Sequence, residues 1–129
     1  SANDVEAMRI DSTGLATFAN GITVSGGITT LGSMSELTIA SGGITVTSSV
    51  HTVDTQNNDA SDNLNTINGG TDGSILILNS AHSDRDVTLK DDSDNLRLAG
   101  DFTLSHANDS IMLIKFGTKW REISRSSNG

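Results

Sequence analysis

Isoleucine and valine alternate with threonine in two stretches of the N-terminal half of the chain. The phrase "GITVSGGITT" occupies residues 21–30, and "GITVT" occupies residues 43–47. An alternation of period two places successive side chains on opposite faces of an extended backbone, which β-branched residues favour. The pattern predicts short β-strands within both stretches.

These two phrases belong to a longer repeat. Residues 15–36 align with residues 37–58 at an offset of 22 residues, so that Leu15 falls on Leu37. The Gly-Ile-Thr-Val phrase of residues 21–24 falls on the same phrase at 43–46. Self-similarity at a fixed period predicts a solenoid-like or fibrous architecture, in which each unit buries its apolar face against its neighbours.

Turn residues divide the chain into three predicted parts. A short strand at residues 7–10 and a Ser-Thr-Gly turn precede the repeat, and the Asn-, Asp- and Gly-rich segment 57–73, with one short strand at 64–67, follows it. We therefore expect a connector strand and turn at 1–14, a repeat-built β shaft at 15–58, and a C-terminal β tip domain at 59–129.

The chain after Gly73 contains six further strand candidates. Their short, regular spacing is typical of a small antiparallel β-sandwich or barrel. The apolar runs Ile75–Leu78 and Ile111–Ile114 predict central strands covered on both faces, and both runs are too short to cross a membrane. No stretch has a helical period, so we expect an all-β protein without membrane insertion. The candidates are residues 74–79, 86–90, 95–99, 101–105, 110–116 and 119–124.

Aromatic residues are scarce, and this changes the expected assembly. They make up 3% of the chain, and Phe18 is the only one among residues 1–101. Aromatic side chains usually supply much of the buried area of a core. We therefore expect the N-terminal part to bury its isoleucines and valines against other copies of the chain, because burial within one copy would not offset the chain entropy lost on folding.

Charge and the absence of cysteine exclude several functions. The formal net charge is -8, and no lysine or arginine lies between Ile10 and Asp84. A chain without a basic stripe is a poor ligand for a phosphate backbone, so we expect no nucleic-acid partner. The basic residues of the C-terminal third alternate with aspartates, which is typical of a solvated surface. Without cysteine there is no disulfide and no thiolate zinc site.

The sequence contains no recognisable catalytic constellation. His51, His82 and His106 lie in polar contexts typical of exposed or hydrogen-bonded loop imidazoles, and no Gly-x-Ser-x-Gly elbow occurs. Most acidic residues are aspartates in turns, where they accept hydrogen bonds from backbone N–H groups. We expect no catalytic residue, no cofactor and no enzyme activity.

The phrase "DDSDN" is the best candidate for a metal ion. Asp91, Asp92 and Asp94 cluster on one loop, and hard cations such as Ca²⁺ prefer oxygen ligands. The EF-hand spacing is absent, and so is the nonapeptide repeat of calcium-binding solenoids. We expect no metal site, although an ion at this loop, or one held by histidines on a three-fold axis, stays open.

Several phrases together resemble bacteriophage tail fibre and tail-spike proteins. The C-terminal phrases are similar to the terminal module of such proteins, and "MRIDSTG" at Met8–Gly14 is similar to the phrase that introduces their shaft repeats. The C-terminal phrases occupy Ile67–Gly73, Ile75–Leu78, Asn95–Phe102 and Gly117–Arg125.

The resemblance implies an elongated homotrimeric β-fibre in the virion, with a β-helix-like shaft and a tip that attaches to the host cell. Its partners would be two further copies, other tail proteins, and a host cell-surface glycan or protein whose contact residues are unknown. The shaft is either intertwined or built from three parallel solenoids. The side chains expected inside the trimer are Ile22, Val24, Ile28, Ile39, Ile44 and Val46.

Two alternatives accompany this interpretation. A tail-spike-like polysaccharide depolymerase, or a bacterial or archaeal surface adhesin, would share the β-rich composition. At the tip, the resemblance implies a hairpin at residues 117–120. Trp120 is expected to pack in the core, since tryptophan is highly buried on average, and the alternative is an exposed ring that stacks on a sugar. Glu122 is expected to pair with Arg121 or Arg125 of a neighbouring copy.

Overall fold

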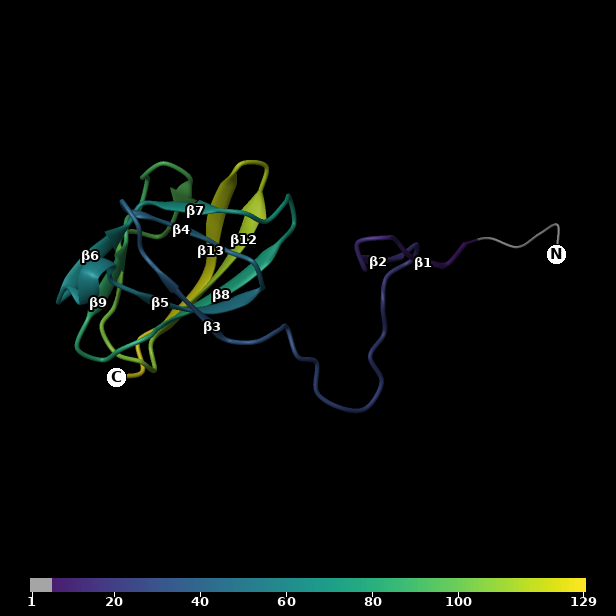
Figure 1. Ribbon diagram of the computed structural model, residues 1–129, viewed down its shortest axis with the longest axis horizontal. Coiled ribbons are helices and arrows are strands. Elements are labelled where there is room, and N and C mark those ends of the chain that lie inside the picture. Colours follow the sequence, from purple (N-terminus) through teal and green to yellow (C-terminus); the bar gives the residue numbers. More distant parts are fainter. Residues whose placement is uncertain (1–5) are drawn as a thin grey trace. The chain divides into compact units, whose positions relative to one another are not determined.

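The computed structural model of the protein describes residues 6–129, shown as a ribbon in Figure 1. The chain divides into two compact units, residues 1–30 and residues 31–129. The regular elements within the described residues are β-strands and one short 3-10 helix, which confirms the all-β prediction. None of the described helices has the length and apolarity that a membrane crossing requires.

The first unit contains one small hairpin. Strand β1 (Met8–Ile10) pairs antiparallel with β2 (Ala16–Phe18), which confirms a strand at the position predicted for residues 7–10. In the turn between them, the Asp11 carboxylate accepts hydrogen bonds from the Thr13 hydroxyl and N–H and from the Leu15 N–H. These bonds, that of the Thr13 hydroxyl first, lower the pKa of Asp11.

The predicted strand over residues 21–30 is wrong for the single chain. Residues 19–34 contain no strand, and the side chains of Ile22, Val24 and Ile28 are 66%, 59% and 95% exposed. A strand needs a partner for its backbone N–H and C=O groups, and residues 21–30 pair with no strand among the described residues.

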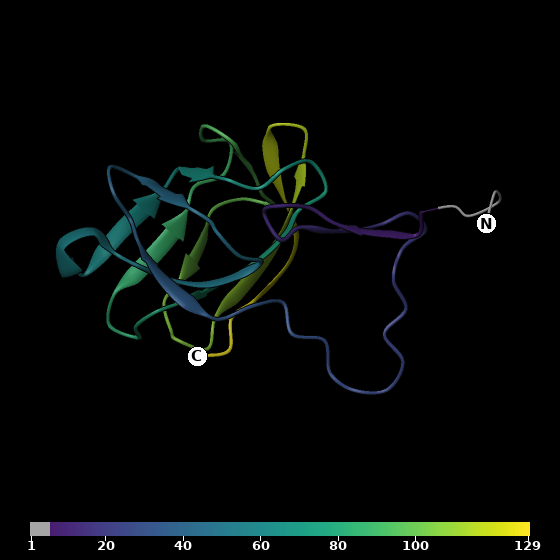
Figure 2. The same ribbon diagram turned by 45° about the vertical axis from the view of Figure 1, so that its right-hand side comes forward.

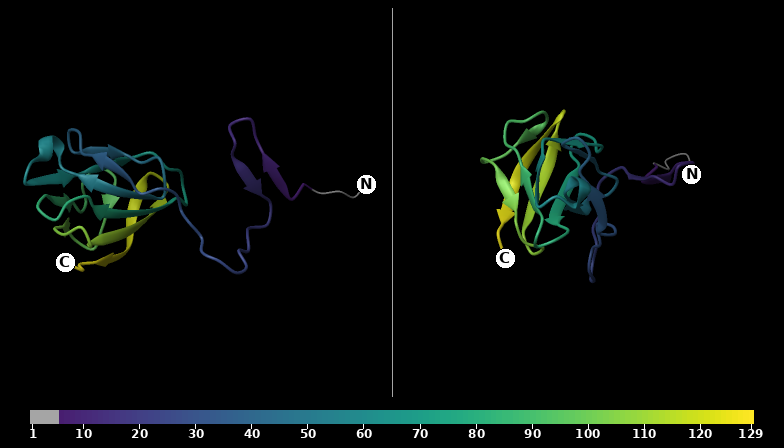
Figure 3. Two further views of the ribbon diagram at one scale, coloured as in Figure 1. Left: turned by 60° about the horizontal axis from the view of Figure 1, so that its bottom comes forward. Right: turned by 60° about the vertical axis from the view of Figure 1, so that its left-hand side comes forward.

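The second unit is a β-solenoid-like fold of about three turns. Figures 2 and 3 show its strands from three further directions. Its elements in chain order are β3 (Ser35–Thr38), β4 (Gly43–Thr45), β5 (Val50–Asp54), η1 (Gln56–Asn58), β6 (Ser61–Leu64), β7 (Thr66–Asn68), β8 (Ile75–Ser80), β9 (Asp86–Leu89), β10 (Leu96–Arg97), β11 (Phe102–Leu104), β12 (Ser110–Phe116) and β13 (Lys119–Ser126).

Successive coils stack in parallel. Strands β4, β5 and β6 form one coil, and β7, β8 and β9 lie beside them in the next, as Figure 1 shows for β4 and β7 and for β6 and β9. The paired residues are 23, 27 and 25 positions apart, close to the repeat of 22 in the sequence. The pairs are Gly43 with Thr66, Val50 with Ile77, and Ser61 with Asp86.

The direction of pairing reverses after β9. Strand β11 runs antiparallel to β9, and β12 runs antiparallel to both β8 and β13, whereas β10 pairs in parallel with β13. Three sheets result, in the strand orders β10-β13-β12-β8-β5-β3, β11-β9-β6 and β4-β7. The C-terminal part therefore mixes parallel with antiparallel pairs, where the sequence indicated antiparallel ones throughout.

The core lies inside the second unit. Ile39, Ile44 and Val46 are at most 8% exposed, so the expectation that these side chains need other copies for burial is wrong. Stacked coils supply the apolar neighbour that a second copy would otherwise provide, as where Ile44 pairs with Ile67. The remaining core residues are Val53, Leu64, Leu76, Leu78, Val87, Leu89, Leu96, Phe102, Leu104, Ile111, Leu113 and Trp120.

The two apolar runs lie in the centre of the largest sheet. Strands β8 and β12 are central there, as predicted, but only alternate side chains are fully buried, so the prediction of full cover on both faces is wrong. Ile75, for example, is 39% exposed. Residues 35–58 lie in the same compact unit as residues 59–129, and the division into shaft and tip at residue 58 stays a prediction for the assembled protein.

Two glycines test how tightly the coils stack. Gly69 and Gly73 both have positive φ, +92° and +87°, but a Cβ at Gly69 would lie 2.5 Å from the Val46 carbonyl oxygen, whereas a Cβ at Gly73 meets no atom within 4 Å. We expect Gly73→Ala to lower the free energy of unfolding by about 1–2 kcal/mol, the cost of the left-handed backbone. Gly69→Ala should cost about 3 kcal/mol or more, because the coils must move apart. Urea unfolding measures both, and equal losses would contradict the stacking.

Candidate functional site

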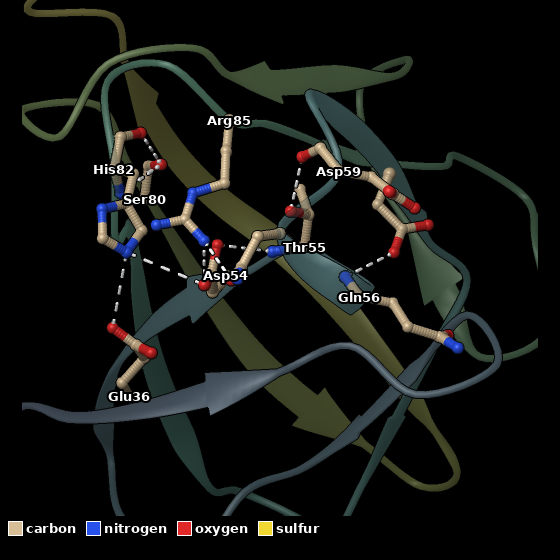
Figure 4. Close-up of polar contacts among 10 residues, drawn as sticks. Glu36, Asp54, Thr55, Gln56, Asp59, Ser80, His82 and Arg85 are labelled. Atoms are coloured by element: carbon tan, nitrogen blue, oxygen red, sulfur yellow. Dashed lines mark hydrogen bonds and ion pairs between the residues drawn. The ribbon is translucent and has the colours of Figure 1, made fainter.

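Four charged or titratable side chains meet at the ends of three neighbouring strands. Glu36 lies on β3, Asp54 ends β5, and His82 and Arg85 lie in the link from β8 to β9. Because β3, β5 and β8 are adjacent in one sheet, these residues from distant parts of the sequence come together. Figure 4 shows the His82 and Arg85 side chains pointing toward Asp54.

Asp54 is the centre of this cluster. Its side chain is 6% exposed, and its Oδ2 lies 2.8 Å from Arg85 Nη1, while Oδ1 accepts a hydrogen bond of 2.8 Å from the Thr55 N–H. His82 Nε2 lies 3.7 Å from Asp54 Oδ2 and 3.9 Å from Glu36 Oε2. The buried carboxylate is thus neutralised by a charge-assisted hydrogen bond to an arginine.

The same cluster has the composition of a metal site. Ligand atoms of Glu36, Asp54 and His82 lie within 4.8 Å of one another, and carboxylates and imidazole are ordinary ligands of divalent cations. However, the Asp54 oxygen nearest His82 is the one that binds Arg85. The Asp54–Arg85 ion pair therefore ties β5 to the β8–β9 link, and His82 lies between the carboxylates of Asp54 and Glu36.

Replacing Arg85, the cation that pairs with Asp54, tests this interpretation. We expect Arg85→Met to lower the free energy of unfolding by about 3 kcal/mol, because it removes the arginine partner of the buried Asp54 carboxylate. The double variant Arg85→Met/Asp54→Asn should recover part of that loss, since it removes the uncompensated charge. Urea unfolding of both variants measures the effect. A double variant less stable than Arg85→Met would contradict the role assigned to Arg85.

The predicted aspartate loop does not converge on one point. Asp91 accepts a hydrogen bond of 2.7 Å from the Leu98 N–H, Asp92 lies 3.4 Å from the Arg97 guanidinium, and Asp94 accepts one from a threonine hydroxyl of β7. Among residues 6–129, only Glu36, Asp54 and His82 form a possible metal-binding group. Only Asp91 accepts a hydrogen bond from a backbone N–H group, as the sequence indicated, whereas Asp92 and Asp94 bind side chains.

The histidines differ in environment. His51 is fully buried on β5, and its Nε2 accepts hydrogen bonds of 3.1 Å from the N–H groups of Thr47 and Ser48. Its Nδ1 lies 3.0 Å from the Ser35 carbonyl oxygen. His51 is hydrogen-bonded as predicted, but it lies in a strand of the sheet. It fixes the turn before β5 and the start of β3.

Trp120 belongs to the core. Its side chain is 1% exposed, and Nε1 donates a hydrogen bond of 3.1 Å to the Ile67 carbonyl oxygen. This confirms the core role, and the alternative of an exposed ring for sugar stacking is wrong. Glu122 accepts a hydrogen bond of 2.6 Å from Arg125 Nε of the same chain, where a partner in a neighbouring copy was expected.

A hollow of about 260 Å³ lies over one edge of Trp120. Four hydroxyl side chains from the β4–β5 and β7–β8 links line it, together with Val46, Gly70 and Ile75. No charged side chain lines it. Sequence reasoning missed the hollow, because its two links are a whole coil apart along the chain and meet only through stacking.

No known protein family matches this chain, and a comparison with curated proteins finds no match either.

Proposed function

We propose that the protein is a homotrimeric segment of a bacteriophage tail fibre whose C-terminal part attaches to the host cell surface. The observation that carries this proposal is an uncharged N-terminal segment with unburied apolar side chains. Residues 12–35 contain no charged residue. The exposed side chains in this segment are Leu15, Phe18, Ile22, Val24, Ile28, Leu31 and Met34.

The internal repeat supports a buried state for this segment. Ile22 and Val24 are 66% and 59% exposed, but their equivalents in the second copy, Ile44 and Val46, are 3% and 8% exposed. The same pattern of apolar residues thus lies in a core in one copy and in solvent in the other. The gathering of seven exposed large apolar side chains within residues 15–34 favours an interaction site in this segment.

The absence of charge favours identical partners. When equivalent surfaces of identical chains meet, like charges face each other and repel, and an uncharged segment avoids this cost. A different protein would more often be selected by complementary charges, which residues 12–35 do not offer. Three copies, rather than two, follow from the resemblance to tail fibres.

The C-terminal part has the properties expected of an attachment module. It has a core of its own, and the phrases at Ile67–Gly73 and Gly117–Arg125 that resemble tail fibre tips lie within it. A rigid domain on an elongated support presents its loops to a surface. The partner is a host cell-surface glycan or protein, and other tail proteins join the segment to the virion.

The oligomeric state tests the proposal. Light scattering of the chain in native buffer should give three times the chain mass of 13.4 kDa. The variant Ile22→Asp/Val24→Asp should be monomeric, because it places carboxylates at apolar positions that the proposed trimer buries, where they would lose water without gaining a partner. Thr23→Asp/Ser25→Asp adds the same charges at neighbouring polar positions and is the control. A wild-type monomer would refute the trimer.

A further inference from the structure

The hollow beside Trp120 has the chemistry of a binding site for a neutral, hydroxyl-rich ligand. We propose that it binds one neutral sugar residue of a cell-surface glycan. This inference rests on the proposed attachment function and names the place on the molecule where attachment occurs.

Two hydroxyl groups of the lining are free for a ligand. Ser48 Oγ donates to the Leu31 carbonyl oxygen, and Ser74 Oγ accepts from the Thr71 N–H. The hydroxyls of Thr47 and Ser49 have no partner among residues 6–129. A serine or threonine hydroxyl both donates and accepts, so it matches a sugar hydroxyl in either direction.

Apolar surface lies beside these hydroxyls. Ile75, which is 39% exposed, supplies the accessible apolar surface of the hollow, whereas Val46 and Trp120 also line it but are only 8% and 1% exposed. Such a surface matches the C–H groups on the face of a sugar ring. Pockets for drug-sized ligands measure about 300–1,000 Å³, so a hollow of about 260 Å³ holds a single ring rather than an oligosaccharide.

Charge selects against acidic ligands. The chain carries a net charge of -8, and no charged side chain lines the hollow. An anionic sugar would therefore meet repulsion without a free cation in the lining. A neutral hexose, deoxyhexose or N-acetylhexosamine meets neither obstacle.

The walls of the hollow are held in place before any ligand arrives. Trp120 is fixed by its hydrogen bond to Ile67, and the backbone of Thr47 and Ser48 is fixed by His51. A Cβ at Gly70 would lie 2.8 Å from Trp120 Cζ2, so the ring packs directly on the backbone. A preformed site loses little conformational freedom on binding.

Trp120 is the only tryptophan in the chain, so its indole N–H gives one NMR signal that reports on the hollow. We would titrate the full chain with glucose, galactose, mannose, rhamnose and N-acetylglucosamine, each up to about 100 mM, the range for weak affinities. At least one sugar should shift the Trp120 indole signal and the amides of Thr47–Ser49 with a shared, saturable Kd in the millimolar range. Absence of a saturable shift for all five sugars would overturn the inference.

Matched variants locate the binding. Thr47→Val/Ser49→Ala removes both free hydroxyls with little change of shape, and should weaken the bound sugar about tenfold. Thr17→Val/Ser127→Ala makes the same changes at exposed positions outside the hollow and should leave the affinity unchanged. If both double variants bound the sugar with equal affinity, the sugar would bind outside the hollow.

Cell binding separates this inference from the proposed function. Fluorescently labelled protein is incubated with a panel of bacterial strains, and the two double variants are compared. Binding to cells without any sugar-induced shift would overturn the hollow and leave attachment standing. A sugar-induced shift without binding to any strain would support the hollow and contradict the attachment function.

Discussion

Replacing Trp120 by alanine is expected to lower the free energy of unfolding of the C-terminal unit by about 3–5 kcal/mol. The side chain is 1% exposed, and its ring packs on the backbone of Gly70. Truncation would leave a cavity at the junction of β7, β8 and β13, and it would leave the Ile67 carbonyl oxygen without the indole donor. A loss of this size is a large part of the stability of an ordinary domain.

Circular dichroism during urea unfolding measures this loss, since the variant has no tryptophan fluorescence. Trp120→Phe keeps much of the ring but not the N–H donor, so it should cost less than Trp120→Ala. Phe116→Ala removes an aromatic side chain that is 45% exposed on the neighbouring strand, and it should change the stability little. If Trp120→Ala and Phe116→Ala had similar effects, the central place of Trp120 in the core would be refuted.

The second large effect is expected at Asp109. Its side chain is fully buried, and its carboxylate accepts hydrogen bonds from the backbone N–H groups of Ser105, His106, Asn128 and Gly129. Burial by itself raises the pKa of Asp109, but the four backbone donors together lower it below its ordinary value. One ionised side chain therefore fastens the C-terminal residues to the turn before β12.

We expect Asp109→Asn to lower the free energy of unfolding by about 2–4 kcal/mol at pH 7, because hydrogen bonds to a charged acceptor are lost. The folded-state pKa lies below the unfolded value, so the stabilisation is complete above the unfolded pKa of 3.8 and is lost as the pH falls through the folded pKa. The difference between wild type and variant should thus shrink between pH 5 and pH 2.

Guanidinium unfolding at several pH values measures this difference. Asp84→Asn neutralises an exposed carboxylate near the same sheet and serves as the control for net charge. A difference between wild type and Asp109→Asn that stays constant down to pH 2 would show that the carboxylate is not stabilised by its donors.

The sequence was sufficient to predict the all-β class and a solenoid-like architecture, but not its position. The repeat was expected at residues 15–58, whereas the stacked strands also include β6, β7, β8 and β9 of the expected tip domain. The alternation of isoleucine and valine with threonine at residues 43–47 is the pattern of β4, and the repeat length is close to the stacking offsets. Burial of Ile44 and Val53 within one chain was not predicted, because the scarcity of aromatic residues indicated too little buried area for a core within one copy. Stacked coils reach a dry interior with aliphatic side chains alone.

The sequence also did not predict which segment pairs with β5. The repeat aligns residues 29–32 with 51–54, but in the structure Ser35–Thr38 occupies the place beside β5. A shift of register changes which face every side chain occupies, and the hydrogen bond between His51 and Ser35 is the kind of contact that selects one register. Periodicity alone does not contain that information.

The candidate sites show the same limit. The turn roles of Asp91 and Asp109 follow from local chemistry and could be predicted. The cluster around Asp54 joins Glu36 to His82 across two strand pairings, and the hollow beside Trp120 joins links from different coils. The positions of the Asp54 cluster and of the hollow depend on the number of residues in each coil, and that number varies with the length of the turns between strands.

Because strand direction reverses after β9, the two ends of the solenoid differ in whether a further coil can stack on them. At its C-terminal end, the antiparallel strands β11 and β12 occupy the hydrogen-bonding edges of β9 and β8, so a further parallel coil has no place to dock. At the other end, β3, β4 and β6 are edge strands of their sheets. A further coil in parallel register would therefore have to stack on the β3, β4 and β6 edges.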